Sequence, residues 1–309
     1  MMARTAPFLI LRLLVFVGIG VAYIISLGLG AMLGLAFGTI FSPEPFTGAF
    51  IGAVLGFGLV SLVLYLAREY LLYLVKAAHI AVLVELYDGR AIPNGQSQIR
   101  FGADCIKAHF ATTSVLFGVD LLVKAVLRTV FGTVNFITAF VPIPGLGGLV
   151  KMAEGVVRLS LTYVDEIILA YLIRTRTDNP WDSAKDGLVL YAQNYTHFLK
   201  NALWLAFFLW GLTIAVFVVL LAPTAALVAL VPGPFALWGF AVALILALAF
   251  KAAVLEPIAI ACLMQVYFAT ITGQKPDPEW DARLSGTSRK FREFAEKAAS
   301  WGSPKSRAA

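Results

Sequence analysis

Long apolar runs follow one another along this chain, and charged residues occur mainly at their ends. Three stretches contain no charged residue, and they are bounded by Arg12 and Glu44, by Glu44 and Arg68, and by Lys200 and Lys251. A helix needs about 20 apolar residues to cross the hydrocarbon core of a bilayer. The pattern therefore predicts an all-α, polytopic membrane protein, and the lengths of these stretches alone account for four transmembrane helices.

A Pro-x-Pro motif separates the two apolar runs of each pair. The motif occurs at residues 43–45, 142–144 and 232–234, with spacings of 99 and 90 residues. A repeat of this length is typical of one supersecondary unit that is copied along a chain. We therefore expect three Pro-tipped helical hairpins, about six transmembrane helices in all, within a single membrane domain over residues 1–309.

Each hairpin ends in a polar turn that contains a proline, a common helix-stop signal. These turns define internal repeats over residues 8–93, 97–180 and 199–276. The returning run of the first repeat is much longer than a bilayer is thick, and its charges lie in its second half, so cytoplasmic helical extensions are expected. Residues 277–309 form a basic cytoplasmic tail. In this tail, residues 288–301 predict a short amphipathic helix that lies on the membrane surface.

Composition and charge placement indicate the topology. The chain is 60% hydrophobic and 14% charged, with a net charge of +6, whereas soluble domains carry about 25% charged residues. Arg4 and Arg12 precede the first apolar run, and the three tips contain no Lys or Arg. The positive-inside rule predicts a multi-pass protein of the plasma (inner) membrane, with cytoplasmic termini and tips on the opposite side. The expected partners of the basic tail are anionic lipid headgroups rather than nucleic acid.

The middle hairpin differs from the others because it carries charges at depths where the outer hairpins have none. On its two helices the charges recur at helical spacing, and they are Asp120, Lys124, Arg128, Lys151, Glu154, Arg158, Asp165 and Glu166. A charge at the bilayer centre costs at least about 2.5 kcal/mol and usually faces a polar cavity or another charge. Three interpretations stay open: a hydrated path or substrate site, a salt-bridged seam, or a hairpin that lies low with its charges at the cytoplasmic interface.

The first hairpin carries a glycine zipper. Small residues recur every fourth position in its first helix, at Gly18, Ala22, Ser26, Gly30, Gly34, Gly38 and Ser42, and in its second helix at Gly48, Gly52 and Gly56. Such rows allow helix backbones to approach closely in lipid. The row predicts packing within the hairpin, and it also fits self-association or, less directly, a pore lining.

The sequence contains few residues in the arrangements that enzymes or cofactor-binding proteins use. Cys105 and Cys262 are far apart in apolar surroundings, and they indicate neither a disulfide framework nor a metal site. His109 and His197 occur at equivalent places in two repeats, but without a second ligand at metal-binding spacing. No nucleophile elbow or phosphate-binding loop is found. We expect a protein without cofactor or metal that is not an enzyme, although an intramembrane hydrolase or lipid transferase needs only a few polar residues.

Residues 155–275 resemble the C-terminal half of the choline transporter-like family. The resemblance is carried by Tyr163, Tyr171, Ser183, Ala184, Asn194, the hairpin at 202–250 and Cys262. It implies transport. The predicted function is therefore a transporter or channel for a small solute or ion, with the charged middle hairpin as its path. The alternative is a non-transporting assembly or scaffold subunit that forms homo-oligomers, or joins other membrane subunits, through the glycine-rich first hairpin.

Overall fold

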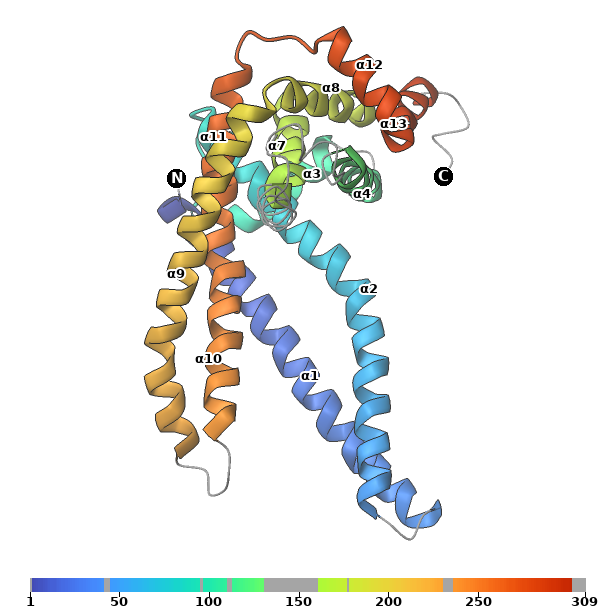
Figure 1. Ribbon diagram of the computed structural model, residues 1–309, viewed down its shortest axis with the longest axis vertical. Coiled ribbons are helices and arrows are strands. Elements are labelled where there is room, and N and C mark those ends of the chain that lie inside the picture. The colour runs from blue at the N-terminus through green and yellow to red at the C-terminus, as the bar shows by residue number, and fades with distance from the viewer. Residues whose placement is uncertain are drawn as a thin grey trace, which may run out of the picture. The chain divides into compact units, whose positions relative to one another are not determined.

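The computed structural model describes residues 2–41, 45–94, 97–109, 113–130, 161–176, 178–229 and 236–301, and the regular elements among them are helices. In chain order these are η1 (Met2–Thr5), α1 (Ala6–Phe41), α2 (Pro45–Tyr87), α3 (Ser97–His109), α4 (Thr113–Val130), η2 (Leu161–Tyr163), α7 (Val164–Thr175), α8 (Pro180–Gln193), α9 (Tyr195–Ala229), α10 (Ala236–Phe250), η3 (Lys251–Leu255), α11 (Glu256–Ile271), α12 (Pro278–Thr287) and α13 (Arg289–Ser300) (Figure 1). The all-α prediction is confirmed for these residues.

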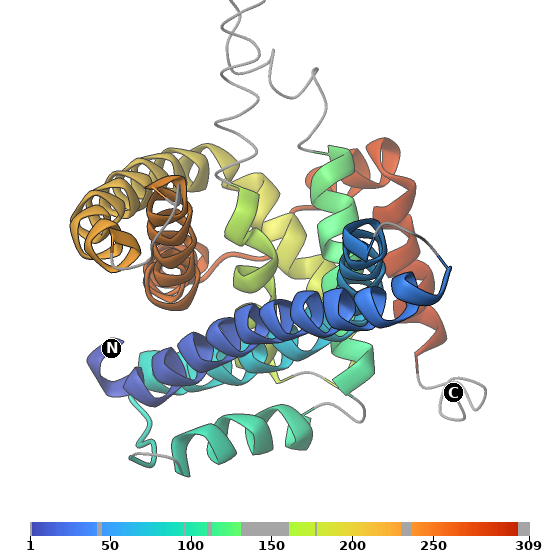
Figure 2. The same cartoon turned by 90° about the horizontal axis from the view of Figure 1, so that it is seen from below.

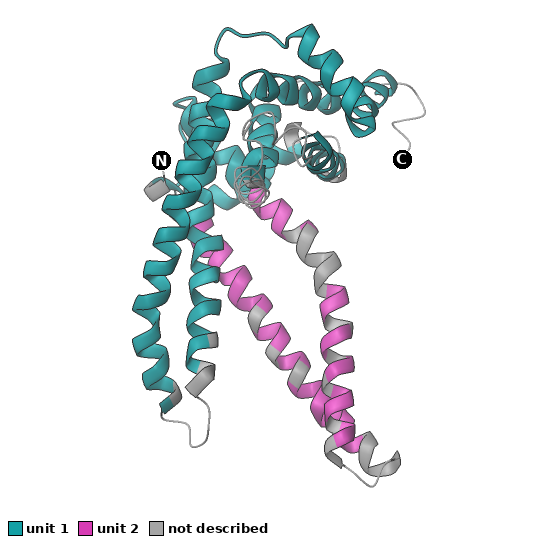
Figure 3. Ribbon diagram, viewed as in Figure 1, with its two compact units in different colours: residues 1–7, 77–309 teal, residues 8–76 magenta. Residues whose placement is uncertain are grey.

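The chain divides into two compact units (Figure 3). Unit 2 contains residues 8–76, which form most of α1 and the first part of α2. Unit 1 contains residues 1–7 and 77–309.

Three helices among the described residues are long and apolar enough to span a membrane: Ala6–Ala36, Tyr195–Leu227 and Val242–Ile271. The chain is thus a membrane protein with transmembrane helices. Six spans and the three-hairpin layout stay predictions, because residues 131–160, which include the middle tip, lie outside the described part of the chain.

In unit 1, α9 and α10 pack side by side as an apolar pair (Figures 1 and 2). Their helices approach closely at Gly239, where an added methyl group would lie 3.3 Å from the Cα atom of Ala225. Large apolar side chains cover their outer surface, among them Trp204, Val219 and Ile245. Such a surface is stable where lipid rather than water surrounds the helices.

In unit 2, α1 and α2 contact each other through their glycines. A methyl group added to Gly34 would lie 2.7 Å from the Cα atom of Gly52, and one added to Gly52 would lie 2.7 Å from the nitrogen of Gly34. Neither helix has room for a side chain here, so this part of the glycine row serves packing within the hairpin. The ring of Tyr23 on α1 also meets that of Phe57 on α2, with 5.4 Å between their centroids.

Gly34→Ala is expected to destabilise this hairpin by about 1–3 kcal/mol, because the backbones have to separate to admit the methyl group. Thermal unfolding in detergent, followed by circular dichroism, measures the loss as a lower Tm. Gly18→Ala is the matched control, since a methyl group there meets no described atom within 4 Å. Equal Tm values for the two variants would contradict the close contact.

Opposite the free ends of α9 and α10, unit 1 forms a helical head with a protein-like core. We use "head" for residues 77–87 with α4, α7, α8, α12 and α13. Residues 77–84 of α2 are almost completely buried. The hydroxyl group of Tyr267, on α11, donates a hydrogen bond of 2.9 Å to the carbonyl oxygen of Gly187 on α8. The prediction of helical extensions beyond the transmembrane part agrees with this layer.

Amphipathic helices follow the polar turns that end the repeats. α8 and α12 both begin with a proline at the first helical position, where its missing N–H group costs nothing. The residue before each proline is a side-chain cap: Asn179 accepts from the amide of Asp182 at 3.3 Å, and Asp277 from that of Glu279 at 2.8 Å.

The polar turns of the first two repeats are joined by ion pairs. Glu85 pairs with Arg90 and, at 2.6 Å, with Arg176. Asp88 pairs with Arg90 at 2.9 Å and with Arg174 at 3.0 Å. Glu85 and Asp88 at the end of α2 thus pair with Arg176 and Arg174 at the end of α7. These ion pairs join the first repeat to the second.

The predicted amphipathic helix in the tail exists as α13, but its apolar face does not meet lipid. Phe291 and Phe294 are completely buried, and the ring of Phe294 lies 6.1 Å from that of Trp181 on α8. Trp301 donates to the carbonyl oxygen of Asp178 at 2.7 Å. The expectation that these aromatic residues face the membrane surface is therefore wrong, because α4 and α8 cover them.

Candidate functional site

Four charged residues of the middle repeat meet between α4 and α7. Asp120 and Lys124 lie one turn apart on α4, and the lysine Nζ atom donates to the Asp120 Oδ2 atom at 2.7 Å. The same Nζ atom lies 3.4 Å from the Asp165 Oδ2 atom, across the helix interface. Glu166 follows Asp165 in the first turn of α7. We call these four residues the acidic cluster.

Local sequence explains why these side chains are enclosed. α4 has apolar residues on most of its surface, such as Leu116, Val119 and Val123, and it packs against α7, α8, α12 and α13. Asp120 and Asp165 are therefore buried, and so is Glu166 at 4% exposure. Only Lys124 reaches the surface, with 40% of its side chain exposed.

The acidic cluster holds more negative than positive charge. Three carboxyl groups and one amine carry a formal charge of −2 when all four are ionised. Burial and the closeness of like charges disfavour the ionised form of a carboxyl group, so such a site favours uptake of a proton. α4 and α7 belong to none of the three helices identified as long and apolar enough to span.

The pKa values of the acidic cluster follow from this excess of carboxyl groups. Burial raises the pKa of Asp165 well above its ordinary value, and the charge and hydrogen bond of Glu166 and the charge of Asp120 raise it further, against the opposing effect of Lys124. Partial burial lowers the pKa of Lys124, but Asp120 and Asp165 outweigh this effect and raise it overall. The lysine is therefore charged at neutral pH, and Asp165 is the carboxyl group best placed to retain a proton.

Asp165→Asn is expected to flatten the dependence of stability on pH. Because the pKa of Asp165 is higher in the folded than in the unfolded protein, its contribution is fully present below the ordinary aspartate pKa, about 3.9. It is lost as the pH rises through the raised value. Tm measured in detergent over a pH series should therefore fall less steeply for the variant than for the wild type. Glu279→Gln, at a side chain that is 69% exposed, is expected to keep the wild-type slope. If Asp165→Asn showed the wild-type slope of Tm against pH, the raised pKa of Asp165 would be contradicted.

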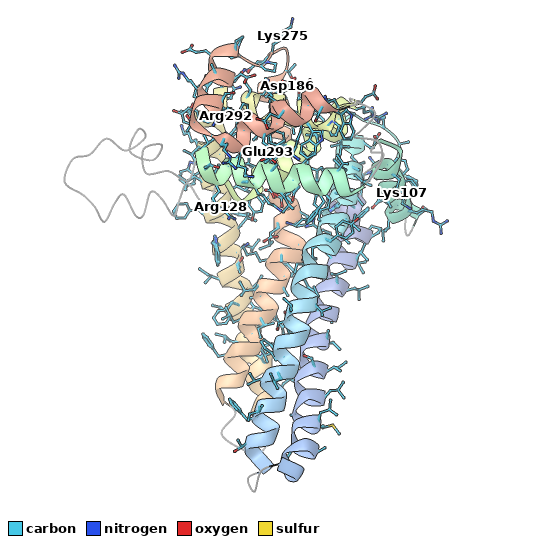
Figure 4. The ribbon with its side chains drawn as sticks, turned by 90° about the vertical axis from the view of Figure 1, so that its right-hand side faces the viewer. Lys107, Arg128, Asp186, Lys275, Arg292 and Glu293 are labelled. Atoms are coloured by element: carbon cyan, nitrogen blue, oxygen red, sulfur yellow. The ribbon has the colours of Figure 1, made fainter. Side chains whose placement is uncertain are left out.

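The remaining predicted path residues are not part of the acidic cluster as described. Arg128 lies one turn beyond Lys124 on α4 and is exposed (Figure 4). Lys151, Glu154 and Arg158 lie outside the described residues. The spacing of Asp120, Lys124 and Asp165 in the sequence predicted helix faces, whereas their meeting across α4 and α7 required the structure.

Metal binding finds no support in the described part of the chain, where no group of three His, Cys, Asp or Glu side chains could hold a metal ion. His197 is exposed at the start of α9. Sequence reasoning did not find the ion pairs of Glu85 and Asp88 with the arginines of α7. The sequence did contain a signal for these ion pairs, because all these residues lie at or beside equivalent polar turns of the first two repeats.

The fold and the acidic cluster together define an all-helical membrane protein with a helical head that encloses three carboxyl groups beside Lys124. No protein-family model, no curated protein and no solved structure matches this chain.

Proposed function

We propose that this protein is a membrane transporter or channel that moves protons, and that the acidic cluster is where the proton binds. The observation that carries the proposal is that three carboxyl groups lie enclosed beside the amine of Lys124 between α4 and α7. Burial and the closeness of other carboxyl groups favour the protonated form of a carboxyl group, so this site can take up and release a proton.

Lys124 gives the proposed site a way to release its ion. The lysine pairs with both Asp120 and Asp165, and part of its side chain reaches the surface. A proton that binds Asp165 competes with the amine of Lys124 for the carboxyl group, so binding remains weak enough for exchange. Transport needs this balance, because an ion that is held too tightly does not leave its site.

Flux into proteoliposomes tests the proposal. Vesicles that contain the purified protein and a pH-sensitive dye should take up protons faster than protein-free vesicles. Asp165→Asn should slow uptake by about tenfold or more, since loss of one charge-assisted contact costs about 1.5–3 kcal/mol. Asp186→Asn, at a half-buried carboxyl group of α8 outside the acidic cluster, should leave the rate unchanged.

Two results would overturn the proposal. One is that the wild-type protein moves no protons. The other is that Asp165→Asn moves them at the wild-type rate with the wild-type dependence on pH.

The second candidate function is a non-transporting assembly subunit. Gly18 and Gly28 favour it, since a methyl group added at either would meet no described atom within 4 Å, which leaves room for another helix. Gly34 and Gly52 support it less, because they contact each other within the hairpin. If chains associate through the open positions, Gly28→Leu should lower the mass measured in mild detergent, and an unchanged mass would count against assembly through this face.

A further inference from the structure

α4 runs crosswise to the α9–α10 pair, all three being parts of unit 1 (Figures 1 and 4). Both views place α8, α12 and α13 on the side of α4 away from the free ends of α9 and α10. These helices cover one side of α4 through direct packing. The opposite side of α4 faces the direction in which α9 and α10 extend.

The uncovered side of α4 is amphipathic. Leu121 is 48% exposed, and Phe117 and Ala125, one turn before and after it, are partly exposed. Arg128 and the 40% exposed side chain of Lys124 lie on the same side. An apolar stripe with basic residues at its edge is typical of a helix that lies in the membrane interface.

The level of the interface is marked on α9 by the start of its exposed apolar surface. Lys200 is exposed near the start of α9, and this surface begins one turn later, with Trp204 at 71% exposure. Lys251 lies at a deeper level, because its Nζ atom is 5.3 Å from the ring centroid of Trp210, which follows Trp204 by six residues, about 9 Å along the helix. Tryptophan and lysine at the end of an apolar helix are typical of the headgroup level.

We propose that α4 is an interfacial helix whose uncovered side rests on the phospholipid headgroup layer. Leu121 enters the boundary between headgroups and acyl chains, and Arg128 binds lipid phosphates. A guanidinium group complements phosphate in charge and geometry. The middle repeat then meets the membrane from the head side along α4, and the acidic cluster lies immediately behind the headgroup layer.

Depth-dependent quenching of a fluorescent label tests this placement without any measurement of transport. A chain with Cys105→Ala and Cys262→Ala receives one new cysteine, through Leu121→Cys on α4, Val218→Cys on α9 or Glu296→Cys on α13. All three positions are exposed, so labelling should not disturb the core. Each labelled protein is reconstituted in phosphatidylcholine vesicles that carry a quencher either close to the headgroup or near the acyl-chain end.

The label at position 121 should lose most of its fluorescence to the shallow quencher and little to the deep one. The label at position 218 should show the reverse order, and the label at position 296 should respond to neither. If position 121 behaves like position 296, α4 faces water. If it behaves like position 218, α4 is inserted as a span. Either result overturns the proposal. A second variant tests the phosphate contact. Arg128→Gln should weaken the quenching of the label at position 121 by the shallow quencher, and unchanged quenching would overturn the contact between Arg128 and phosphate.

Discussion

Phe294→Ala is expected to lower the free energy of unfolding of the head by about 3–5 kcal/mol, the usual cost of removing a fully buried phenyl ring. The ring is completely buried and lies against Trp181. Its removal leaves a cavity where α13 meets α4 and α8. Urea unfolding in detergent, followed by tryptophan fluorescence, should show the loss as a lower midpoint.

The same helix supplies the control for this prediction. Glu296 is exposed on α13, and Glu296→Ala should change stability by no more than about 0.5 kcal/mol. Hydrogen exchange gives a second measurement, because the amides of α13 should exchange faster in Phe294→Ala than in the wild type. Wild-type stability and exchange for Phe294→Ala would mean that α13 does not pack on the head.

Lys124→Met is expected to destabilise the head by about 3 kcal/mol at neutral pH. Removal of one partner of a buried ion pair costs about 3–5 kcal/mol, and the lower end applies because Lys124 is partly exposed. The variant removes the amine with which the buried carboxyl groups of Asp120 and Asp165 both pair. The same urea titration measures the loss, which should shrink at low pH, where the carboxyl groups take up protons.

Two further variants separate the lost charge pair from lost packing. Lys107→Met, at an exposed lysine of α3 (Figure 4), should unfold like the wild type. Asp165→Asn added to Lys124→Met should restore part of the stability, since it replaces a buried carboxyl group that has lost its lysine by a neutral amide. A double variant less stable than Lys124→Met would contradict the pairing of Lys124 with Asp165.

Local patterns in the sequence anticipate much of the helical structure. Apolar runs without charge predicted the membrane helices, and polar turns with proline predicted where α2, α7 and α11 end. The small-residue row predicted a close helix contact, which α1 and α2 make at Gly34 and Gly52. These features depend on residues within one helix or one hairpin, so neighbouring residues specify them.

Tertiary contacts decided the rest. The helical period of α13 determined which residues share its apolar face, but an apolar face is equally suited to lipid and to protein. Only the packing of Phe291 and Phe294 against the head distinguished the two. Likewise, the spacing of Asp120 and Lys124 predicted a pair on one helix, whereas the approach of Asp165 and Glu166 depends on how α7 packs against α4.

The sequence by itself thus determined the helices, their apolar and charged faces, and the membrane character of the chain, because these follow from residue type and helical period. The tertiary structure alone decided which faces meet. It placed the charges of α4 against α7 in an enclosed head, since contacts between residues far apart in the chain depend on the packing of all the helices together.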